Sequence, residues 1–497
     1  MLKTQDFEFW FVTGSQHLYG DEAIRQVEEH SREIVETWKE QEDLPFKVVL
    51  KPVLTTSDAI RRLCIEANSN EHCAGIITWM HTFSPAKMWI PGLSENKKPL
   101  LHLHTQFNRD IPWESIDMDF MNLNQSAHGD REYGFIGARM NIARKVVVGH
   151  WQDPTVNTKI SNWMDTAAAF TSGKNLKVAR FGDNMRDVAV TEGDKVEAQI
   201  KFGWSVYGYG VGDLVEHIEA VSDGEVSRLY EEYNDHYTIS DEAHRTPEIR
   251  RSIQNQARIE LGMKDFLTEG NFSAFTTTFE DLHGMTQLPG LAVQRLMEQG
   301  YGFGGEGDWK TAALLRMVKI MARNRRTSFM EDYTYHLDPE NELVLGSHML
   351  EICPTVAATR PEIKVHPLSM GGKEDPARMV FDGDEGEAIN ASLVDLGDRF
   401  RLVINEVEAV KPSVEMPNLP VAKVLWKPKP SLSESAEAWI HAGGAHHTVF
   451  SFQVTPEQLY DWSVMAGIEC VMINEETKSI PFQNELKWND IAFKLNS

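Results

Sequence analysis

This chain of 497 residues lacks most features of exported or membrane-bound proteins. It has only four cysteines, no two of them in a CxxC pair, so neither a disulfide framework nor a thiolate zinc site is expected. No apolar run approaches the ~20 residues that a membrane span requires. The strand-like start at residues 7–12 is too short and too aromatic for a secretory signal. These absences predict a cytoplasmic protein with free thiols.

Positive charge is also scarce, because 49 lysines and arginines stand against 74 acidic residues and leave a net charge of −25. Such a surface repels phosphate groups, which argues against a nucleic-acid partner and against an anionic membrane. The hydrophobic content of 41% is that of an ordinary globular protein, and the length predicts several domains. An acidic balance is common in soluble enzymes, so it does not by itself identify a partner.

The first third of the chain alternates strand-like and helical segments. The expected strands are residues 7–12, 46–50, 74–80 and 99–104. This alternation predicts a doubly wound, Rossmann-like α/β domain over residues 1–175. In such sheets the working residues follow the carboxyl ends of strands, where Gln16, His81 and Gln106 stand.

A polar loop at residues 122–131 precedes a helix that we expect over residues 132–151. The loop carries Gln125 and His128 among other polar side chains. Such a loop lines a site or a subunit contact, or it is simply the entry to the helix.

The remaining chain predicts two further domains. Residues 176–326 read as a second Rossmann-like α/β domain, with a strand at 176–181, helices at 192–200, 211–235 and 248–262, and a strand at 273–280. After residue 327, short strand-like runs are interrupted by prolines, which occur at strand edges and turns. We expect an antiparallel β-barrel domain at 327–497, with one helix near residues 456–467.

One glycine-dense loop, residues 302–308, has a carboxylate at its centre, Glu306. Glycines allow backbone angles with φ > 0 and leave room beside the chain. An apolar helical run begins at Trp309. Glu306 is thus expected near a helix start, facing a divalent metal and a sugar. A plain turn with an exposed acid explains this stretch equally well.

Four residues stand out as metal ligands: Glu306, Glu331, His348 and His447. Two carboxylates and two imidazoles suit Mn²⁺, Mg²⁺, Co²⁺ or Zn²⁺, with positions left open for water or substrate. The separations of 25, 17 and 99 residues contain no local metal motif, and an isolated histidine like His348 is more often simply hydrogen-bonded. If His446 and His447 lie on one strand, they face opposite sides and one of them binds the metal.

Six stretches together resemble the L-arabinose isomerase family over essentially the whole length. They are FVTGSQHLYG (11–20), TWMHTFSPAKMW (78–89), GGEGDWK (304–310), SFMEDYTY (328–335), GSHMLEICP (346–354) and GGAHH (443–447). The resemblance implies two α/β domains followed by a β-barrel, and one Mn²⁺ (or Co²⁺ or Mg²⁺) per subunit on the four residues above. It also implies a homohexamer of stacked trimers.

The same resemblance implies positions for the sugar. Gln16, Met185, Phe279 and His446 are placed near it, and Gln125 and His128 reach a neighbouring subunit's pocket. We expect His81 to hold a sugar hydroxyl together with Gln16. Met370 stands where some members carry an aliphatic residue, so the preference between L-arabinose and related sugars stays open.

The expected activity is the conversion of L-arabinose to L-ribulose, with D-galactose to D-tagatose open as a second conversion. Proton transfer between C1 and C2 through an enediol, with Glu306 and Glu331 as acid and base, is one route, and a direct hydride shift is the other. Two rival interpretations are a metal hydrolase that uses Glu331 as base and a non-catalytic sugar-binding protein with two α/β lobes.

Overall fold

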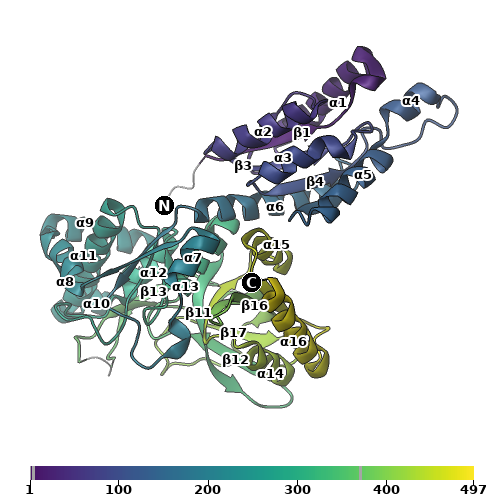
Figure 1. Cartoon of the computed structure of the whole chain (residues 1–497). Helices are drawn as coiled ribbons and strands as arrows, with labels where there is room; N and C mark the ends of the chain where they lie inside the picture. Colours follow the sequence, from purple (N-terminus) through teal and green to yellow (C-terminus); the bar gives the residue numbers. More distant parts are fainter. Residues whose placement is uncertain (1, 3–5, 369–371, 497) are drawn as a thin grey trace. The chain divides into compact units, whose positions relative to one another are not determined.

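The computed structural model describes residues 2, 6–368 and 372–496. The chain divides into two compact units, of which one is Thr4–Ser172 and the other contains Gly173–Ser497. In Figure 1 the first unit runs from purple to blue and the second from teal to yellow. No helix in the described ranges has both the length and the apolar composition to cross a bilayer.

The first unit contains a five-stranded parallel sheet with the order β2-β1-β3-β4-β5. Its strands are β1 (Glu8–Thr13), β2 (Lys47–Leu50), β3 (Cys73–Trp79), β4 (Leu100–His104) and β5 (Lys145–Val148). Its helices are α1 (Gly20–Glu40), α2 (Ser57–Ser69), α3 (Ile90–Glu95), α4 (Met118–Leu123), α5 (Ser126–Arg139) and α6 (Pro154–Gly173), with short 3₁₀ turns η1 (His17–Tyr19) and η2 (Ala86–Trp89). The predicted parallel α/β arrangement is confirmed.

Both faces of this sheet are covered by helices. On one face, Trp10 and Ile76 share a buried cluster with Ile60 of α2. On the other face, Phe11 of β1 meets the ring of Trp38 of α1 edge-on, at a centroid distance of 5.6 Å. The strand order reverses between β1 and β3, and in open α/β sheets ligands bind at the carboxyl ends beside such a reversal.

The prediction of a helix over residues 132–151 is wrong at both ends. Helix α5 begins earlier, at Ser126, and ends at Arg139, and strand β5 follows. Asn141 takes φ 52, a left-handed angle that no helix continues through. The next segment contains three successive valines, whose branched side chains favour a strand. Because α5 begins at Ser126, Gln125 is the N-cap of this helix and not a residue of the predicted loop.

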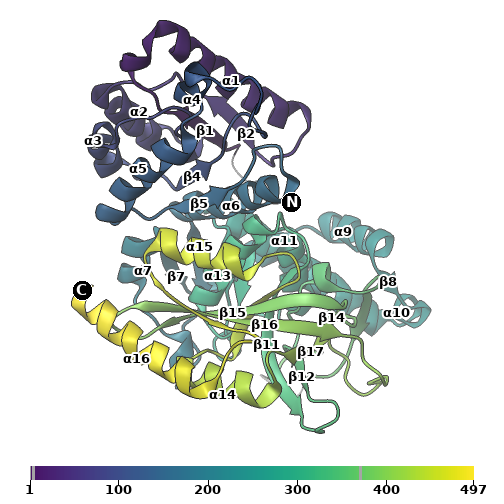
Figure 2. The same ribbon diagram turned by 90° about the vertical axis from the view of Figure 1, so that its right-hand side faces the viewer.

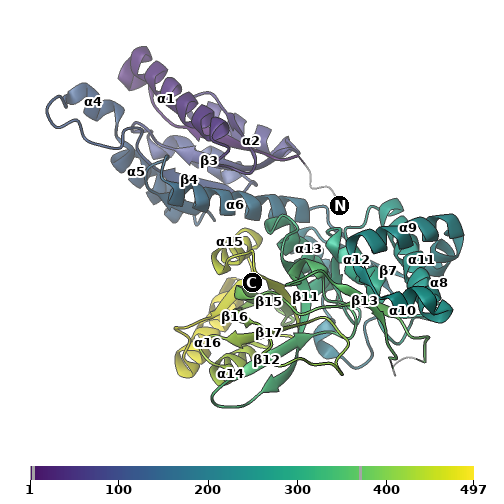
Figure 3. The same cartoon turned by 180° about the vertical axis from the view of Figure 1, so that it is seen from behind.

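The second unit begins with a four-stranded parallel sheet with the order β10-β9-β6-β7. Its strands are β6 (Lys177–Phe181), β7 (Ser205–Tyr209), β9 (Ala274–Thr276) and β10 (Gly302–Gly304). The accompanying helices are α7 (Lys195–Phe202), α8 (Val211–Ala220), α9 (Asp223–His236), α10 (Asp241–Arg245), α11 (Pro247–Glu269), α12 (Gly290–Glu298) and α13 (Trp309–Met321). Figure 3 shows α8, α9 and α11 side by side near β7.

One predicted helix of this region, residues 211–235, is in fact two. Helix α8 ends at Ala220 and α9 begins at Asp223. Ser222 and Glu225 form a capping box, in which each side chain accepts a hydrogen bond from the other residue's backbone N–H. The S-x-x-E spacing of a capping box is present in the sequence. The helical pattern on both sides of it led to the prediction of one continuous helix.

The last part of the chain forms a seven-stranded mixed sheet with the order β15-β18-β11-β12-β17-β16-β19. Its strands are β11 (Thr327–His336), β12 (Leu343–Ser347), β15 (Gly386–Asp395), β16 (Phe400–Val410), β17 (Lys423–Pro428), β18 (His447–Ser451) and β19 (Glu469–Ile473). Strand β15 also pairs with β16 along its whole length, and only β19 runs parallel to its partner. A small sheet joins β8 (Thr238–Ile239), β13 (Glu362–Val365) and β14 (Ala377–Val380).

The sequence anticipates α15 (Pro456–Ala466) but neither α14 (Leu432–Ala442) nor α16 (Ser479–Asn496). Figure 2 shows α14 and α16 beside the strands of the mixed sheet. The prolines before Ser431 predict turns and no helix. Ser431 in fact caps α14, since its side chain accepts a hydrogen bond from the backbone N–H of Glu434.

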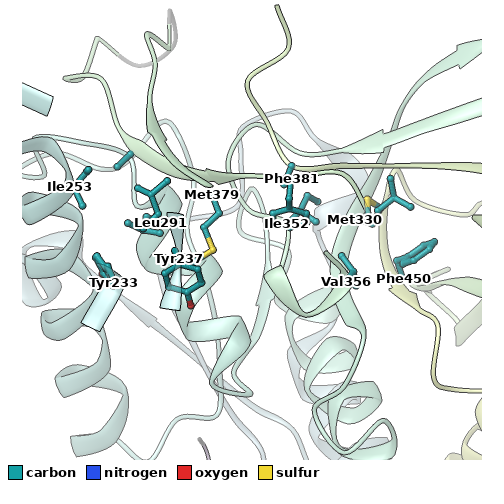
Figure 4. Packing of buried hydrophobic residues seen from close by; sticks show 14 of the residues in the cluster. Tyr233, Tyr237, Ile253, Leu291, Met330, Ile352, Val356, Met379, Phe381 and Phe450 are labelled. Carbon is teal, nitrogen blue, oxygen red and sulfur yellow. The ribbon is translucent and has the colours of Figure 1, made fainter. Parts of the chain in front are cut away.

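Helix α13 joins the parallel sheet to the mixed sheet. All of its residues are buried, and it packs against β9 and β10 on one side and against β11, β15 and β18 on the other. A second line of buried side chains runs from Tyr233 and Ile253 in the helical region through Met379 to Phe450 in the mixed sheet (Figure 4). The two sheets therefore share one core.

Candidate metal centre

Glu306 lies in the tight loop between β10 and α13. Its backbone takes φ 58 and that of Gly307 takes φ 81, so a non-glycine residue here holds a left-handed angle that costs conformational energy. The amide of Met185 donates to the carbonyl of Glu306 at 2.9 Å. Asp308 caps α13 by accepting from the backbone N–H of Thr311. These bonds hold the backbone of the loop that carries Glu306.

The Glu306 carboxylate faces the start of β18. Its Oε2 lies 3.5 Å from Nε2 of His446 and 3.8 Å from Nε2 of His447. His447 is the first residue of β18 and His446 precedes the strand, so the alternation of a strand does not separate their side chains. The condition under which the two rings were expected to face opposite sides is therefore not met, and both rings reach Glu306.

The other two predicted ligands belong to the same sheet. Glu331 of β11 stands opposite His447 on β18 and opposite Ser347 on β12. His348 follows Ser347 directly, and its Nε2 lies 3.9 Å from Oε2 of Glu331. The rings of His348 and His447 have centroids 5.9 Å apart. Four residues from distant parts of the chain therefore lie next to one another in space, and the position between them is the candidate metal position.

The residues around this point fit a cation. Nε2 of His447 is buried and has no hydrogen-bond partner among the described residues, although a neutral or charged ring nitrogen normally has one. A Cβ added to Gly305 would lie 3.2 Å from Nε2 of His348 and 3.4 Å from Nε2 of His447, so the glycine keeps this space open. Glu306, His446 and His447 each offer a ligand atom within 4.8 Å of the others.

Two acids that the sequence analysis missed hold the histidine rings. Glu351 accepts from Nδ1 of His348 at 2.5 Å, and Oδ2 of Asp308 lies 3.3 Å from Nδ1 of His447. Both acids are buried. A carboxylate on Nδ1 leaves Nε2 free as a metal ligand, which is the usual arrangement of histidine–metal sites. The spacing of Glu351, three residues after His348, was the available signal.

Hydrogen bonds, burial and neighbouring charges shift the pKa values of the residues in this cluster. The hydrogen bond from His446 lowers the pKa of Glu306, and the same bond raises the pKa of His446. Burial lowers the pKa of His447 despite the neighbouring Asp308 carboxylate. Burial also opposes charging of His348, but the carboxylate of Glu351, together with those of Glu331 and Glu306, outweighs it and raises the pKa of His348. Glu306 is thus held ionised beside the rings.

Three residues expected near the sugar lie around this cluster. His446 contacts Glu306, and the backbone amide of Met185 is hydrogen-bonded to the carbonyl of Glu306. The ring of Phe279 is stacked with that of His348, with a centroid distance of 6.0 Å. Met370 lies outside the described residues. Phe279 and His446 therefore lie beside the candidate ligands, and the backbone of Met185 is held against the Glu306 loop.

The remaining predicted contacts belong to the unit Thr4–Ser172. Gln16 follows β1, and His81 follows β3, so both stand at the carboxyl ends beside the strand reversal. The two strand ends are tied by a 2.8 Å hydrogen bond between Ser15 and Thr82. His81 is buried, with its Nε2 2.8 Å from Nδ1 of His30.

Gln125 and His128 lie in the same unit, at the start of α5. Oε1 of Gln125 accepts from the hydroxyl of Tyr19 at 3.1 Å. The His128 ring packs on Phe83 with centroids 4.6 Å apart. Gln106, also expected at a strand end, donates to Asn108. The roles of these residues toward a sugar stay predictions.

A buried acid that the sequence analysis also missed supports this strand edge. Asp130 of α5 lies 2.8 Å from Nε2 of His102 and 2.7 Å from Nδ1 of His104, both on β4. It also accepts from the amide of Met80. Asp130 thus fixes the start of α5, including Gln125, against the ends of β3 and β4.

Three family models match consecutive parts of the chain. They describe the N-terminal domain (residues 3–175), the central domain (177–324) and the C-terminal domain (326–469) of L-arabinose isomerase. The L-arabinose isomerase of Geobacillus kaustophilus is 69% identical over 494 residues, covering 99% of this chain and all of that protein. The proteins of that name from Clostridium beijerinckii and Bacillus subtilis are 62% identical over 495 residues, with full coverage of both chains. This chain belongs to the L-arabinose isomerase family.

Proposed function

We propose that the protein is an aldose–ketose isomerase that converts L-arabinose to L-ribulose. The observation that carries the proposal is that Glu306 lies 3.8 Å from His447 and Glu331 lies 3.9 Å from His348, with Glu331 and His447 paired on adjacent strands. The activity matches the names of relatives that are 62–69% identical over the full length. D-Galactose is a candidate second substrate, to be tested in the same assays.

These four residues are the proposed ligands of one Mn²⁺ per subunit, with Co²⁺ and Mg²⁺ as alternatives. The unpartnered Nε2 of His447 and the space kept by Gly305 support a cation here, and carboxylate and imidazole ligands suit such metals. When bound, the cation supplies Lewis acidity that stabilises negative charge on the sugar oxygens O1 and O2.

Glu306 and Glu331 form the proposed acid–base pair. One carboxylate takes the proton from C2 of the aldose and returns it to C1, and the other moves the hydroxyl proton from O2 to O1 by way of the enediol. The lowered pKa of Glu306 keeps that carboxylate ionised and able to accept a proton. L-Ribulose made in tritiated water tests this route, because the proton held on the carboxylate exchanges with solvent and brings label to C1, whereas a direct hydride shift brings none.

The proposed sugar contacts are Gln16, His81, Gln125, His128, Met185, Phe279 and His446. Within their own unit, Phe279 stacks near His348, His446 contacts Glu306, and the backbone amide of Met185 donates to the carbonyl of Glu306. The four others are polar and gather at the strand edge of the unit Thr4–Ser172. A homohexamer with sites between subunits is the proposed assembly, in which Gln125 and His128 serve a neighbouring subunit. Sedimentation of the wild type tests the hexamer.

We also propose three domains, at 1–175, 176–326 and 327–497, and a cytoplasmic location. The pairings β15-β18-β11-β12-β17-β16 together with β15–β16 form a continuous ring, which supports a closed six-stranded barrel in the last domain. Four free cysteines, three of them buried, fit a reducing compartment.

The test uses full-length protein dialysed against a chelator. We expect no ketose from L-arabinose before Mn²⁺ is added and ketose formation afterwards, with one tightly bound Mn²⁺ per chain by metal analysis. Hydrolysis of an ester or amide without ketose would favour the hydrolase, and sugar binding without turnover would favour a binding protein. Metal bound equally by the wild type and by His447→Gln would refute the assigned centre.

A further inference from the structure

Three loops of the second unit follow neighbouring parallel strands and carry proposed site residues. The loop after β6 (the β6 loop) carries Met185, the loop after β9 (the β9 loop) carries Phe279, and the loop after β10 (the β10 loop) carries Glu306. The strand order β10-β9-β6 sets these loops side by side at the carboxyl edge, where ligands of open α/β sheets bind. The connections between the loops therefore determine the spacing of the residues that they carry.

Backbone hydrogen bonds join the β10 loop to both of the others. The amide of Met185 donates to the carbonyl of Glu306 at 2.9 Å. The amide of Gly307 donates to the carbonyl of Thr277 in the β9 loop at 3.0 Å. Any residue except proline supplies such an amide, so these two connections do not depend on particular side chains. The connection between the β6 and β9 loops is different, because charged side chains take part in it.

Arg186, the residue after Met185, bridges the β6 loop to the β9 loop. Its guanidinium lies 3.0 Å from Oε2 of Glu280 and 2.7 Å from Oδ1 of Asp281, the two residues that follow Phe279. The same Glu280 oxygen accepts the backbone N–H of Arg186 at 2.9 Å. One side chain thus holds two consecutive acids, a geometry for which the planar, forked guanidinium is suited.

The two loops also approach each other closely beside this bridge. Asp281 Oδ2 accepts the amide of Asp183 at 3.1 Å, and a Cβ added to Gly182 would lie 2.8 Å from Cβ of Asp281. Asp187 takes φ 65, a left-handed angle that a chain keeps only where its surroundings hold it. Because Arg186 directly precedes Asp187, its contacts hold a turn that is otherwise unfavourable.

The exposure of the bridge argues against a role in stability alone. The side chain of Arg186 is 64% exposed, and those of Glu280 and Asp281 are 30% and 22% exposed. Ion pairs at such positions stabilise a fold little, because water and salt screen them. A small free energy is nonetheless enough to change how often a loop occupies one position, and the apparent affinity for a ligand scales with that fraction.

We propose that Arg186 is a positioning residue for the isomerase reaction. By binding Glu280 and Asp281, it keeps the β6 and β9 loops at the spacing that receives the sugar. Arg186 acts through these loops and not on the reacting atoms or on the metal ligands. This inference rests on the proposed function, in which Met185 and Phe279 contact the sugar.

The experiment measures KM and kcat for L-arabinose, Mn²⁺ affinity and Tm of full-length variants. Arg186→Gln removes the charge at an exposed position, so the fold should be kept. We expect KM to rise about threefold to fivefold, the scale of an exposed ion pair, with kcat and Mn²⁺ affinity unchanged. Arg186→Lys keeps a charge without the fork and should give a smaller rise. Adding Glu280→Gln to Arg186→Gln should raise KM no further, because the two residues act together.

Lys411→Gln is the matched control, since it breaks an exposed ion pair of 2.8 Å with Glu385 in the same unit and should keep the wild-type KM. The proposal is overturned by an unchanged KM in Arg186→Gln, by a rise that Lys411→Gln shares, or by an additive rise in the double variant. A loss of Mn²⁺ affinity in step with KM also overturns it. Absence of ketose in the wild type is a separate result, which refutes the proposed function and this inference with it.

Discussion

Glu331 and His447 stand directly opposite each other on the antiparallel strands β11 and β18. Glu331 also pairs with Ser347, the residue before His348, on its other side. Three of the four proposed ligands are therefore fixed by the register of one sheet. A slip of one residue in either pairing would turn a ligand to the opposite face. Only Glu306 comes from outside this sheet, on the loop that precedes α13.

Replacing Glu306 with glutamine should abolish most turnover and preserve the fold. The change keeps the size of the side chain but removes both the negative charge and the proton acceptor. We expect kcat to fall by a factor on the order of 10² or more, the scale of general acid–base catalysis. Ketose assays and circular dichroism check this, and near-normal turnover would remove Glu306 from the chemistry.

Alanine at position 305 should weaken metal binding with little effect on the fold. The added Cβ would press on Nε2 of His348 and His447, whereas the backbone angle at Gly305 is outside the left-handed region. We expect Mn²⁺ affinity to fall on the order of tenfold, as for changes beside metal ligands. Mn²⁺ titration measures it. Gly212→Ala is the control, because its Cβ would meet nothing within 4 Å.

Asparagine at position 308 should affect both stability and metal binding. Asp308 holds His447 and also pairs with the buried ammonium of Lys310 at 3.2 Å. Losing its charge leaves Lys310 buried without a counter-ion, at a cost of about 3 kcal/mol. Urea unfolding of the metal-free protein measures this cost. Glu351→Gln should weaken Mn²⁺ binding without so large a loss, and equal instability of the two variants would contradict the account.

Stability of the unit Thr4–Ser172 should fall as the pH drops below neutral. Burial, with a smaller contribution from His30, lowers the pKa of His81 from 6.5 to about 3. Below pH 6.5 the unfolded chain binds a proton at His81 that the folded chain refuses, so stability is lost as pH falls from 6.5 toward 3. The slope is about 1.4 kcal/mol per pH unit within that window.

Hydrogen exchange of β3 amides between pH 7 and 5, corrected for intrinsic rates, measures this loss. The variant His81→Gln should show a flatter dependence on pH than the wild type. His72→Gln, at an exposed histidine of the same unit, should keep the wild-type slope. Identical slopes in all three proteins would show that His81 does not carry the effect.

The parallel α/β regions were predictable because buried strands consist of short runs of apolar residues, as in the fully buried β3. The errors arose where local signals competed. Residues 126–148 contain a helix and a strand without a proline between them, and only the left-handed Asn141 separates them. Helix α14 was concealed by the prolines that precede its cap at Ser431.

The candidate ligands were predictable as residue types, but their convergence was not. Glu331 and His447 are brought together by strand pairing between residues 116 positions apart, and spacing in sequence does not encode such pairing. The orienting acids Asp308 and Glu351 were missed because their local sequence indicates other roles. Asp308 has the position of a helix cap, and Glu351 is an acid that follows an apolar run. The six sequence motifs, through the family resemblance, indicated that these ligands act together, which their spacing in the chain did not.

The burial of α13 on every side limits how sequences of this kind can vary in length. Each residue inserted in a helix rotates everything beyond it by about 100°. An insertion within Trp309–Met321 would therefore turn apolar side chains out of two sheets at once and twist the Glu306 loop relative to β11. Related chains should accumulate insertions in exposed turns, such as the one between β11 and β12, and keep the length of this helix constant.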